Sequence, residues 1–162
     1  MTEPPADILR RLRPIPTYSG QPTTTPHDVA GVDPAGGACS VDILGSAGPV
    51  LLLFLSAGCT GCLDLWEGLD QLQAALGEHC RLAVVTKSPG DEDPTRIATL
   101  AGAAPERFGV PVVMSTAAYR DYRVVGPPFL VLTDLAEVRT EGVAWGIAET
   151  LRAARGALGD AP

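Results

Sequence analysis

The sequence predicts an α/β fold with a central mixed β-sheet flanked by helices on both faces. Three observations carry this prediction. Residues 51–55 form an apolar run without helical spacing, which is typical of a buried central strand. After Cys62, leucines and a tryptophan recur at three- and four-residue steps, which indicates a helix. Further strand and helix patterns then alternate and end with a hairpin and a terminal helix, an order that places helices on both sides of a sheet.

The N-terminal half can be assigned first. Turn signals between Thr23 and Ser40 separate two short extended pieces, near 25–29 and 38–41, and predict an extra β-hairpin before the main sheet. The central strand is expected to start after Gly48-Pro49 and to run to about Ser56. The helix that follows is expected to end near Leu76, because Gly77 is a C-cap signal.

The C-terminal half continues the alternation. Asp93 is a suitable N-cap and Pro94 a suitable first helical residue. The expected elements are a strand over 81–86, a helix over 95–101, a short strand over 112–114, a short helix over 116–122, a hairpin of 129–132 with 138–140, and a terminal helix over about 147–158.

Length and composition fit one globular domain. The chain has 162 residues, 46% hydrophobic and 19% charged, and we expect a Pro/Arg-rich arm over 1–22 and a single domain over 23–162. The net charge of −7 argues against a nucleic-acid partner. Neither a bilayer-spanning run nor a signal peptide is recognisable, so the expected location is cytoplasmic. An extracytoplasmic domain without its membrane anchor would have the same sequence, so that alternative stays open.

The feature most informative about function is the Cys-x-x-C pair, Cys59 and Cys62. It stands where the buried strand passes into the helix. Cys59 falls near the start of that helix, where unpaired backbone N–H groups favour an anion such as a thiolate. Two thiols at this spacing can also close a small disulfide ring with little movement of the backbone. The pair therefore predicts a dithiol redox centre.

This order of elements, with the Cys-x-x-C after the first central strand and Gly126-Pro127-Pro128-Phe129 before a hairpin, resembles the thioredoxin superfamily. The hairpin before the sheet and the long segment 81–114 look most like the TlpA/MauD/ResA branch of thiol-disulfide oxidoreductases. The resemblance implies a thioredoxin-like fold over about 38–158 and a dithiol that reduces or oxidises protein disulfides.

The resemblance also assigns roles to residues. Cys59 would be the nucleophile, Cys62 the resolving thiol and Pro128 a cis proline that packs beside them. Substrate would contact the neighbouring residues Gly58, Thr60, Gly61 and Pro127. The implied partners are a protein disulfide or dithiol and an unidentified electron donor or acceptor; no cofactor and no metal is implied.

The sequence departs from the usual pattern of that superfamily in three places. Gly58 stands where a tryptophan commonly precedes the first cysteine. Residues 51–55 contain no acidic side chain, so Glu67 or water would have to take the proton of Cys62. Pro127, directly before the expected cis proline, has no N–H to offer a substrate backbone.

Two alternative functions remain open. Ser56 stands three residues before Cys59, as a hydroxyl does in peroxiredoxins, but Leu52 replaces the proline expected four residues earlier, and a neighbouring Cys62 would intercept a sulfenic acid. A redox-inactive protein that uses the fold only for binding or assembly is the other alternative.

A metal site is a weaker alternative. Cys39 and Cys80 are isolated thiols rather than a second close pair, and they are expected to be buried, although a disulfide between them stays open. The zinc-binding alternative would draw on Cys39, Cys59, Cys62, Cys80, His27 and His79.

Three further features have ordinary structural interpretations. Trp66 and Trp145 are expected to pack in the core or at its edge. The acidic residues 91–93 stand beside prolines and are expected to form a solvated turn.

Overall fold

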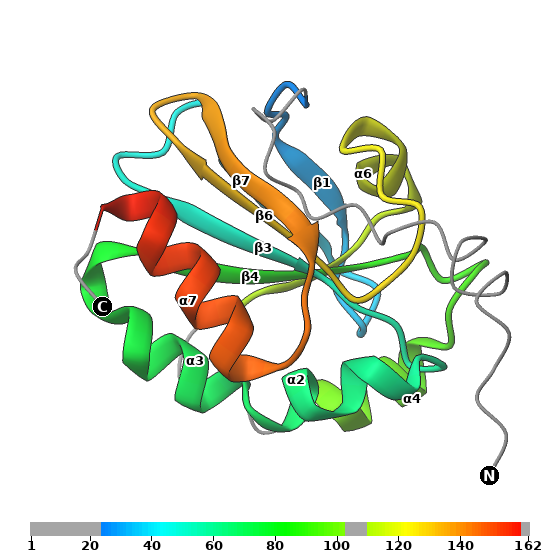
Figure 1. The fold of residues 1–162 in the computed structure, drawn as a ribbon. Coiled ribbons are helices and arrows are strands. Elements are labelled where there is room, and N and C mark those ends of the chain that lie inside the picture. The colour runs from blue at the N-terminus through cyan, green and yellow to red at the C-terminus, as the bar shows by residue number, and fades with distance from the viewer. Residues whose placement is uncertain (1–23, 103–109, 160–162) are drawn as a thin grey trace, which may run out of the picture.

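The computed structural model describes residues 24–102 and 110–159, and in these ranges a seven-stranded mixed sheet has helices on both faces (Figure 1). Its strands are β1 (Val29–Val32), β2 (Ala38–Val41), β3 (Val50–Phe54), β4 (Arg81–Thr86), β5 (Val112–Met114), β6 (Phe129–Asp134) and β7 (Glu137–Val143). The helices are α2 (Leu63–Glu67), α3 (Leu69–Leu76), α4 (Pro94–Ala101), α6 (Thr116–Asp121) and α7 (Ile147–Leu158), with 3₁₀ turns η1 (Thr60–Cys62) and η2 (Gly77–His79). None of the helices described is long and apolar enough to span a membrane. The predicted fold class is confirmed, whereas the predicted arm over 1–22 lies outside the described residues.

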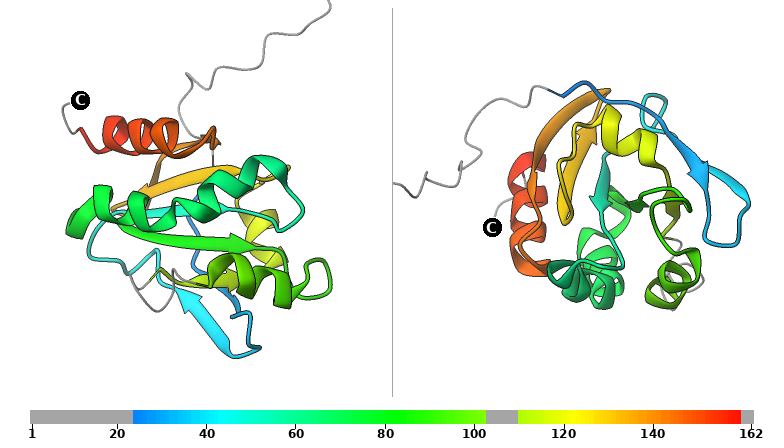
Figure 2. Two further views of the ribbon diagram at one scale, coloured as in Figure 1. Left: turned by 90° about the horizontal axis from the view of Figure 1, so that it is seen from below. Right: turned by 90° about the vertical axis from the view of Figure 1, so that its right-hand side faces the viewer.

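Strand β3 lies in the interior of the sheet, between parallel β4 and antiparallel β6. All five of its residues are buried, because neighbouring strands pair with both of its edges and helices cover both of its faces. Leu51 and Leu53 belong to the core under α2, α3, α4 and α7, whereas Leu52 and Phe54 belong to the core under α6. Figure 2 shows the sheet and the helices that cover it from two further directions. The uninterrupted apolar run is thus explained by burial on both faces.

The strand directions bring three chain segments to one edge of the sheet. Strands β3 and β4 are parallel, so both end at this edge. Strand β6 is antiparallel to β3 and therefore begins there. The segments 55–59, 87–93 and 127–128 consequently lie at the same edge, which in parallel sheets is where binding sites form.

The N-terminal hairpin is present, but its first strand begins later than the predicted 25–29. The Asp33 carboxylate accepts the N–H of Gly37 at 3.0 Å, and this local turn fixes where the chain reverses. The segment predicted as the first strand lies instead against the end of α6, where the His27 N–H donates to the hydroxyl of Tyr122 at 2.8 Å. The segment near 25–29 has the composition of a strand, but the position of the turn at Asp33 determines which residues pair in the hairpin.

The helix predicted from Cys62 to about Leu76 is divided by Gly68, which has φ −98° and ψ 9°. Helix α7 explains the division. A Cβ built on Gly68 would lie 2.6 Å from Cδ1 of Ile147, at the start of α7. Gly68 therefore lets α7 approach the helices that follow the dithiol. The predicted C-cap is confirmed: Gly77 has φ +65° directly after α3.

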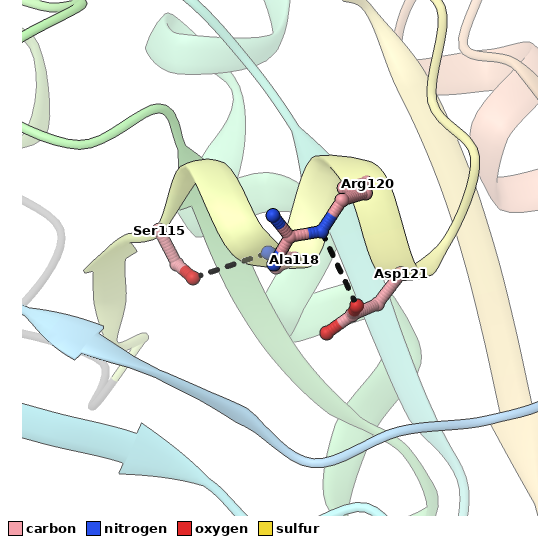
Figure 3. Close-up of polar contacts among 4 residues, drawn as sticks. All are labelled: Ser115, Ala118, Arg120 and Asp121. Carbon is pink, nitrogen blue, oxygen red and sulfur yellow. Dashed lines mark hydrogen bonds and ion pairs between the residues drawn. The ribbon is translucent and has the colours of Figure 1, made fainter.

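Helix α6 is short, and its start is fixed by a side chain. The Ser115 hydroxyl accepts the N–H of Ala118 at 3.2 Å, an N-cap that satisfies one of the free donors of the first turn (Figure 3). Arg120 and Asp121 approach to 4.0 Å near the other end, an ion pair at the surface that contributes little to stability. Between these contacts α6 places Tyr119 in the interior, with 4% of its surface exposed.

The other predicted elements are observed, most of them within two residues of the expected ends. The predicted N-cap of α4 is confirmed, since Asp93 Oδ1 accepts the N–H of Thr95 at 2.9 Å and Pro94 is the first helical residue. The exception is β7, which continues to Val143 rather than ending near Thr140. Pairing with the whole length of β6 extends it beyond its short apolar pattern.

We expect Gly68→Ala to lower the free energy of unfolding by about 1–3 kcal/mol, because the added methyl group would overlap Ile147 and overpacking costs about that much. Urea denaturation followed by circular dichroism measures the change. Gly156→Ala in α7 is the matched control: a Cβ at Gly156 meets open space, so the alanine should raise stability by about 0.5–1 kcal/mol through its helix propensity. Equal effects of the two substitutions would contradict the role given to Gly68.

Candidate active site

The two thiols of the Cys-x-x-C pair lie where the chain leaves β3, as predicted. Cys59 has extended backbone angles (φ −98°, ψ 116°) and directly precedes η1, which ends at Cys62. The N–H of Cys62 donates to the carbonyl of Cys59 at 3.1 Å. Both are free thiols, but Cys59 is half-buried and flanked by the exposed Gly58 and Thr60, whereas Cys62 is completely buried. Of the two sulfurs, that of Cys59 is the accessible one.

The segment Pro127-Pro128 lies beside the dithiol. The peptide bond between the two prolines is cis, the geometry that the resemblance implies for this position. Cys59 Sγ donates to the carbonyl of Pro127 at 3.6 Å. Gly61 faces the ring of Pro128, because a Cβ on Gly61 would lie 3.6 Å from Pro128 Cδ. The fold therefore brings together segments that are 68 residues apart in the chain.

The two thiols have different surroundings. Burial is the main cause that raises the pKa of Cys62 to about 12. A hydrogen bond with Cys59 and the negative charges of Cys59 and Glu92 also raise this pKa, while a backbone hydrogen bond with Ser56 lowers it. At neutral pH Cys62 is therefore a neutral thiol.

Two buried side chains bind the carbonyl groups of the segment between β3 and Cys59. The hydroxyl of Tyr119 donates to the carbonyl of Leu55 at 2.9 Å, from the core under α6. The indole Nε1 of Trp66 donates to the carbonyl of Ser56 at 3.2 Å, from the core under α2. Trp66 is buried, as predicted, and its polar atom serves the site.

Ala57 is bound from the loop between β4 and α4. Its N–H donates to Glu92 Oε2 at 3.4 Å, and Arg96 Nη2 donates to its carbonyl at 3.2 Å. The predicted turn is present and Asp91 and Asp93 are exposed in it, but Glu92 is half-buried and contacts another loop. The contact joins residues 35 apart, so local sequence patterns give no sign of it.

The charge of Glu92 also acts on Cys62. It is among the causes that raise the pKa of Cys62, whereas Glu67, suggested from the sequence, lies exposed on α2 and is not among them. The sequence offered Glu67 because it is near Cys62 in the chain. The fold instead brings Glu92, which is distant from Cys62 in the chain, to the turn between β3 and the thiols.

Cys39 and Cys80 lie apart from the dithiol and from each other. Cys39 is half-buried on β2, and its Sγ donates to the carbonyl of Val112 at 3.9 Å. Cys80 is buried in the core on the other face of the sheet, and burial raises its pKa to about 11. Both are free thiols. In 24–102 and 110–159, no group of three or more His, Cys, Asp or Glu side chains could hold a metal ion, so the zinc-binding alternative gains no support.

Trp145 is exposed, and the prediction that it packs in the core or at its edge is wrong: 67% of its surface is accessible. Its neighbour Ala144 donates an N–H to the carbonyl of Pro128 at 3.1 Å, so its backbone adjoins the proline segment. Gly146, with φ +89°, turns the chain into α7 immediately afterwards and leaves the indole outside the core. Val125, fully exposed, precedes the proline segment on its other side.

No protein-family model matches the sequence, and no curated protein matches it. Solved structures do resemble it. StoA from Bacillus subtilis has a TM-score of 0.61 at 15% identity, over 80% of this chain and 96% of that chain. A secreted disulfide oxidoreductase from Mycobacterium tuberculosis has a TM-score of 0.61 at 15% identity, over 78% of this chain and 94% of that chain. The thioredoxin domain of a thiol-disulfide oxidoreductase from Bacteroides vulgatus has a TM-score of 0.61 at 20% identity, over 82% and 94% of the two chains. At these identities the likeness establishes the fold, which is thioredoxin-like.

Proposed function

We propose that this protein is a thiol-disulfide oxidoreductase that acts on protein disulfides or dithiols through Cys59 and Cys62. The observation that carries the proposal is the arrangement of the two sulfurs: Cys59 is accessible beside the Pro127 carbonyl, and Cys62 is buried behind it on the same turn. Such a pair separates an attacking thiol from a resolving thiol. The solved structures with this fold that are described as oxidoreductases support the proposal by analogy.

The chemistry needs no further group. The Cys59 thiolate attacks one sulfur of a substrate disulfide, forms a mixed disulfide, and the second substrate sulfur leaves as a thiolate. Cys62 then loses its proton to water and attacks Cys59 Sγ. The Cys59–Cys62 disulfide forms, the first substrate sulfur leaves as a thiolate, and two electrons have passed to the substrate. The reverse sequence oxidises a substrate dithiol.

The surface around Cys59 suits a protein substrate. Gly58, Thr60 and Gly61 carry little side chain and leave the sulfur open on one side. Trp145 offers a large exposed apolar surface next to the proline segment, and exposed aromatic residues often dominate protein interfaces.

The proposal predicts a reversible Cys59–Cys62 disulfide. Titration against glutathione, with thiol alkylation and mass spectrometry, should show one two-electron couple, together with insulin reduction that is weaker than that of a typical thioredoxin because the buried thiol ionises poorly. Cys59→Ser should abolish the activity, and Cys62→Ser should accumulate a mixed disulfide at Cys59. A wild-type protein that shows no reversible couple at any glutathione ratio would exclude catalysis and favour a binding or assembly role.

The role of Cys59 as nucleophile predicts its order of labelling. At neutral pH, iodoacetamide should modify Cys59 before the other cysteines, because Cys62 and Cys80 are buried and burial raises the pKa of Cys39, Cys62 and Cys80. Peptide mapping after short exposures gives the order. Modification of Cys62 first would reverse the two roles.

Trp145→Ala should lower kcat/KM for a protein disulfide about tenfold, the effect of losing an aromatic contact of about 1.4 kcal/mol, and leave kcat/KM for a small disulfide unchanged. Leu135→Ala is the matched control. Leu135 is 73% exposed in the turn between β6 and β7, at the end of β6 away from Pro128. Equal losses in both variants, or a loss with the small disulfide too, would argue against a docking role for Trp145.

A further inference from the structure

Helix α2 exposes side chains of two kinds directly after the dithiol. Leu63, with 42% of its surface accessible, follows Cys62 and is the first residue of α2. Asp64 and Glu67 are exposed on the same helix. Trp145, 67% accessible, stands on the connection between β7 and α7. We call these four residues, Leu63, Asp64, Glu67 and Trp145, the α2 rim.

The connection between β7 and α7 runs alongside α2. At its start, Ala144 donates an N–H to the carbonyl of Pro128 at 3.1 Å, and the ring of this proline faces Gly61, just before α2. At its end, Ile147 packs on Gly68, the residue directly after α2. Figure 1 shows the connection passing from β7 to the level of α2 before α7 begins. The exposed tryptophan therefore lies between two contacts that span the length of α2, and the rim forms one surface beside the accessible thiol.

The two carboxylates of the α2 rim have no cation to balance them. The chain from 14 to 80 contains neither lysine nor arginine. Among the residues that the structure describes, no ion pair includes Asp64 or Glu67. The cations on the next segment are engaged elsewhere: Arg96 donates to a backbone carbonyl before the dithiol at 3.2 Å, and Lys87 lies 5.6 Å from the ring centroid of a buried tyrosine. Both negative charges are therefore available to a partner.

The combination of apolar and acidic side chains on this rim favours a particular ligand chemistry. Lysine and arginine join an aliphatic stem to a cationic head, and the stem packs on apolar surface while the head stays in water. Leu63 and Trp145 offer that apolar surface, and the face of a tryptophan also attracts a cation. Asp64 and Glu67 attract the same head and repel a carboxylate.

We propose that the preferred substrates are proteins whose disulfide stands beside lysine or arginine residues, which the α2 rim binds. The inference rests on the proposed function and names its substrate class. The exchange at the sulfurs is unchanged: the Cys59 thiolate attacks one substrate sulfur, the other leaves as a thiolate, and the rim contacts the neighbouring cationic side chain. Asp64 and Glu67 are therefore specificity-determining residues, and they act most strongly at low ionic strength.

Three synthetic peptide disulfides test the proposal. Each is a symmetric dimer with blocked ends, and they differ only in whether the residue next to the cysteine is lysine, glutamine or glutamate. They are mixed with the reduced Cys62→Ser protein, and mass spectrometry gives the rate at which the Cys59 adduct forms. Each rate is divided by the rate of the same peptide with mercaptoethanol, which cancels the effect of the peptide charge on the disulfide itself.

The expected order of these relative rates is lysine, then glutamine, then glutamate. A unit charge about 10 Å away changes a rate about twofold in water, so two carboxylates should separate the lysine peptide from the glutamate peptide about tenfold at low salt. In about 1 M salt the Debye length is about 3 Å, so the difference should disappear.

Charge variants of the rim locate the effect. Asp64→Asn combined with Glu67→Gln should reduce the lysine-to-glutamate ratio to less than about threefold. A change in the reactivity of Cys59 itself would alter all three rates equally, so the ratio reports the rim alone. The matched control, Glu78→Gln combined with Glu137→Gln, removes two exposed carboxylates from the opposite edge of the sheet, before β4 and at the start of β7. It should leave the ratio unchanged.

The outcomes separate the inference from the function on which it rests. Relative rates that do not depend on peptide charge, or an equal fall of the ratio in both double variants, would overturn the proposed substrate class. The proposed function would survive either result if the wild-type protein forms the Cys59–Cys62 disulfide with these peptides. If the wild-type protein forms that disulfide with none of them, the oxidoreductase function fails and the substrate class fails with it.

Discussion

The site depends on how three consecutive carbonyl groups find hydrogen-bond donors after β3 ends. A buried carbonyl or N–H group without a partner costs free energy comparable to a lost hydrogen bond. The N–H of Leu55 still donates to Val85 of β4, but the carbonyls of 55–57 find their partners outside the sheet. Tyr119, Trp66 and Arg96 each donate to one carbonyl of this segment. Because these side chains come from α6, α2 and α4, the position of Cys59 is fixed by helices on both faces of the sheet.

Each of these helices is in turn held by a specific contact. Helix α6 is capped by Ser115, α4 by Asp93, and α2 is joined to α3 at the glycine over which Ile147 of α7 packs. A side chain that approaches 2.6 Å to a hypothetical Cβ leaves no room for another residue at Gly68. The positions of Cys59 and Cys62 therefore depend on contacts that lie well away from the two sulfurs, as expected for a site supported by rigid elements.

The sequence predicts the elements of this fold better than their interruptions. Apolar runs and local caps determine β3 and the start of α4 at Asp93, and both are found as predicted. The break at Gly68 depends on α7, about 80 residues further along the chain, and has no local signal. The dithiol and Pro128 carry recognisable motifs, whereas Glu92 reaches the site only because β3 and β4 are parallel and end together. Trp145 has the apolar character of a core residue, but it lies exposed in the turn between β7 and α7.

The two prolines beside Cys59 limit how a partner can be held. Neither has an N–H, and both carbonyls are already engaged: that of Pro127 accepts from Cys59 while Cys59 is a thiol, and that of Pro128 accepts from Ala144. An extended peptide laid along this segment finds no donor to pair with, so it gains no ladder of backbone hydrogen bonds and no fixed register. A partner at this edge of the sheet is therefore oriented by side-chain contacts. Such contacts do little to determine in which direction its backbone runs.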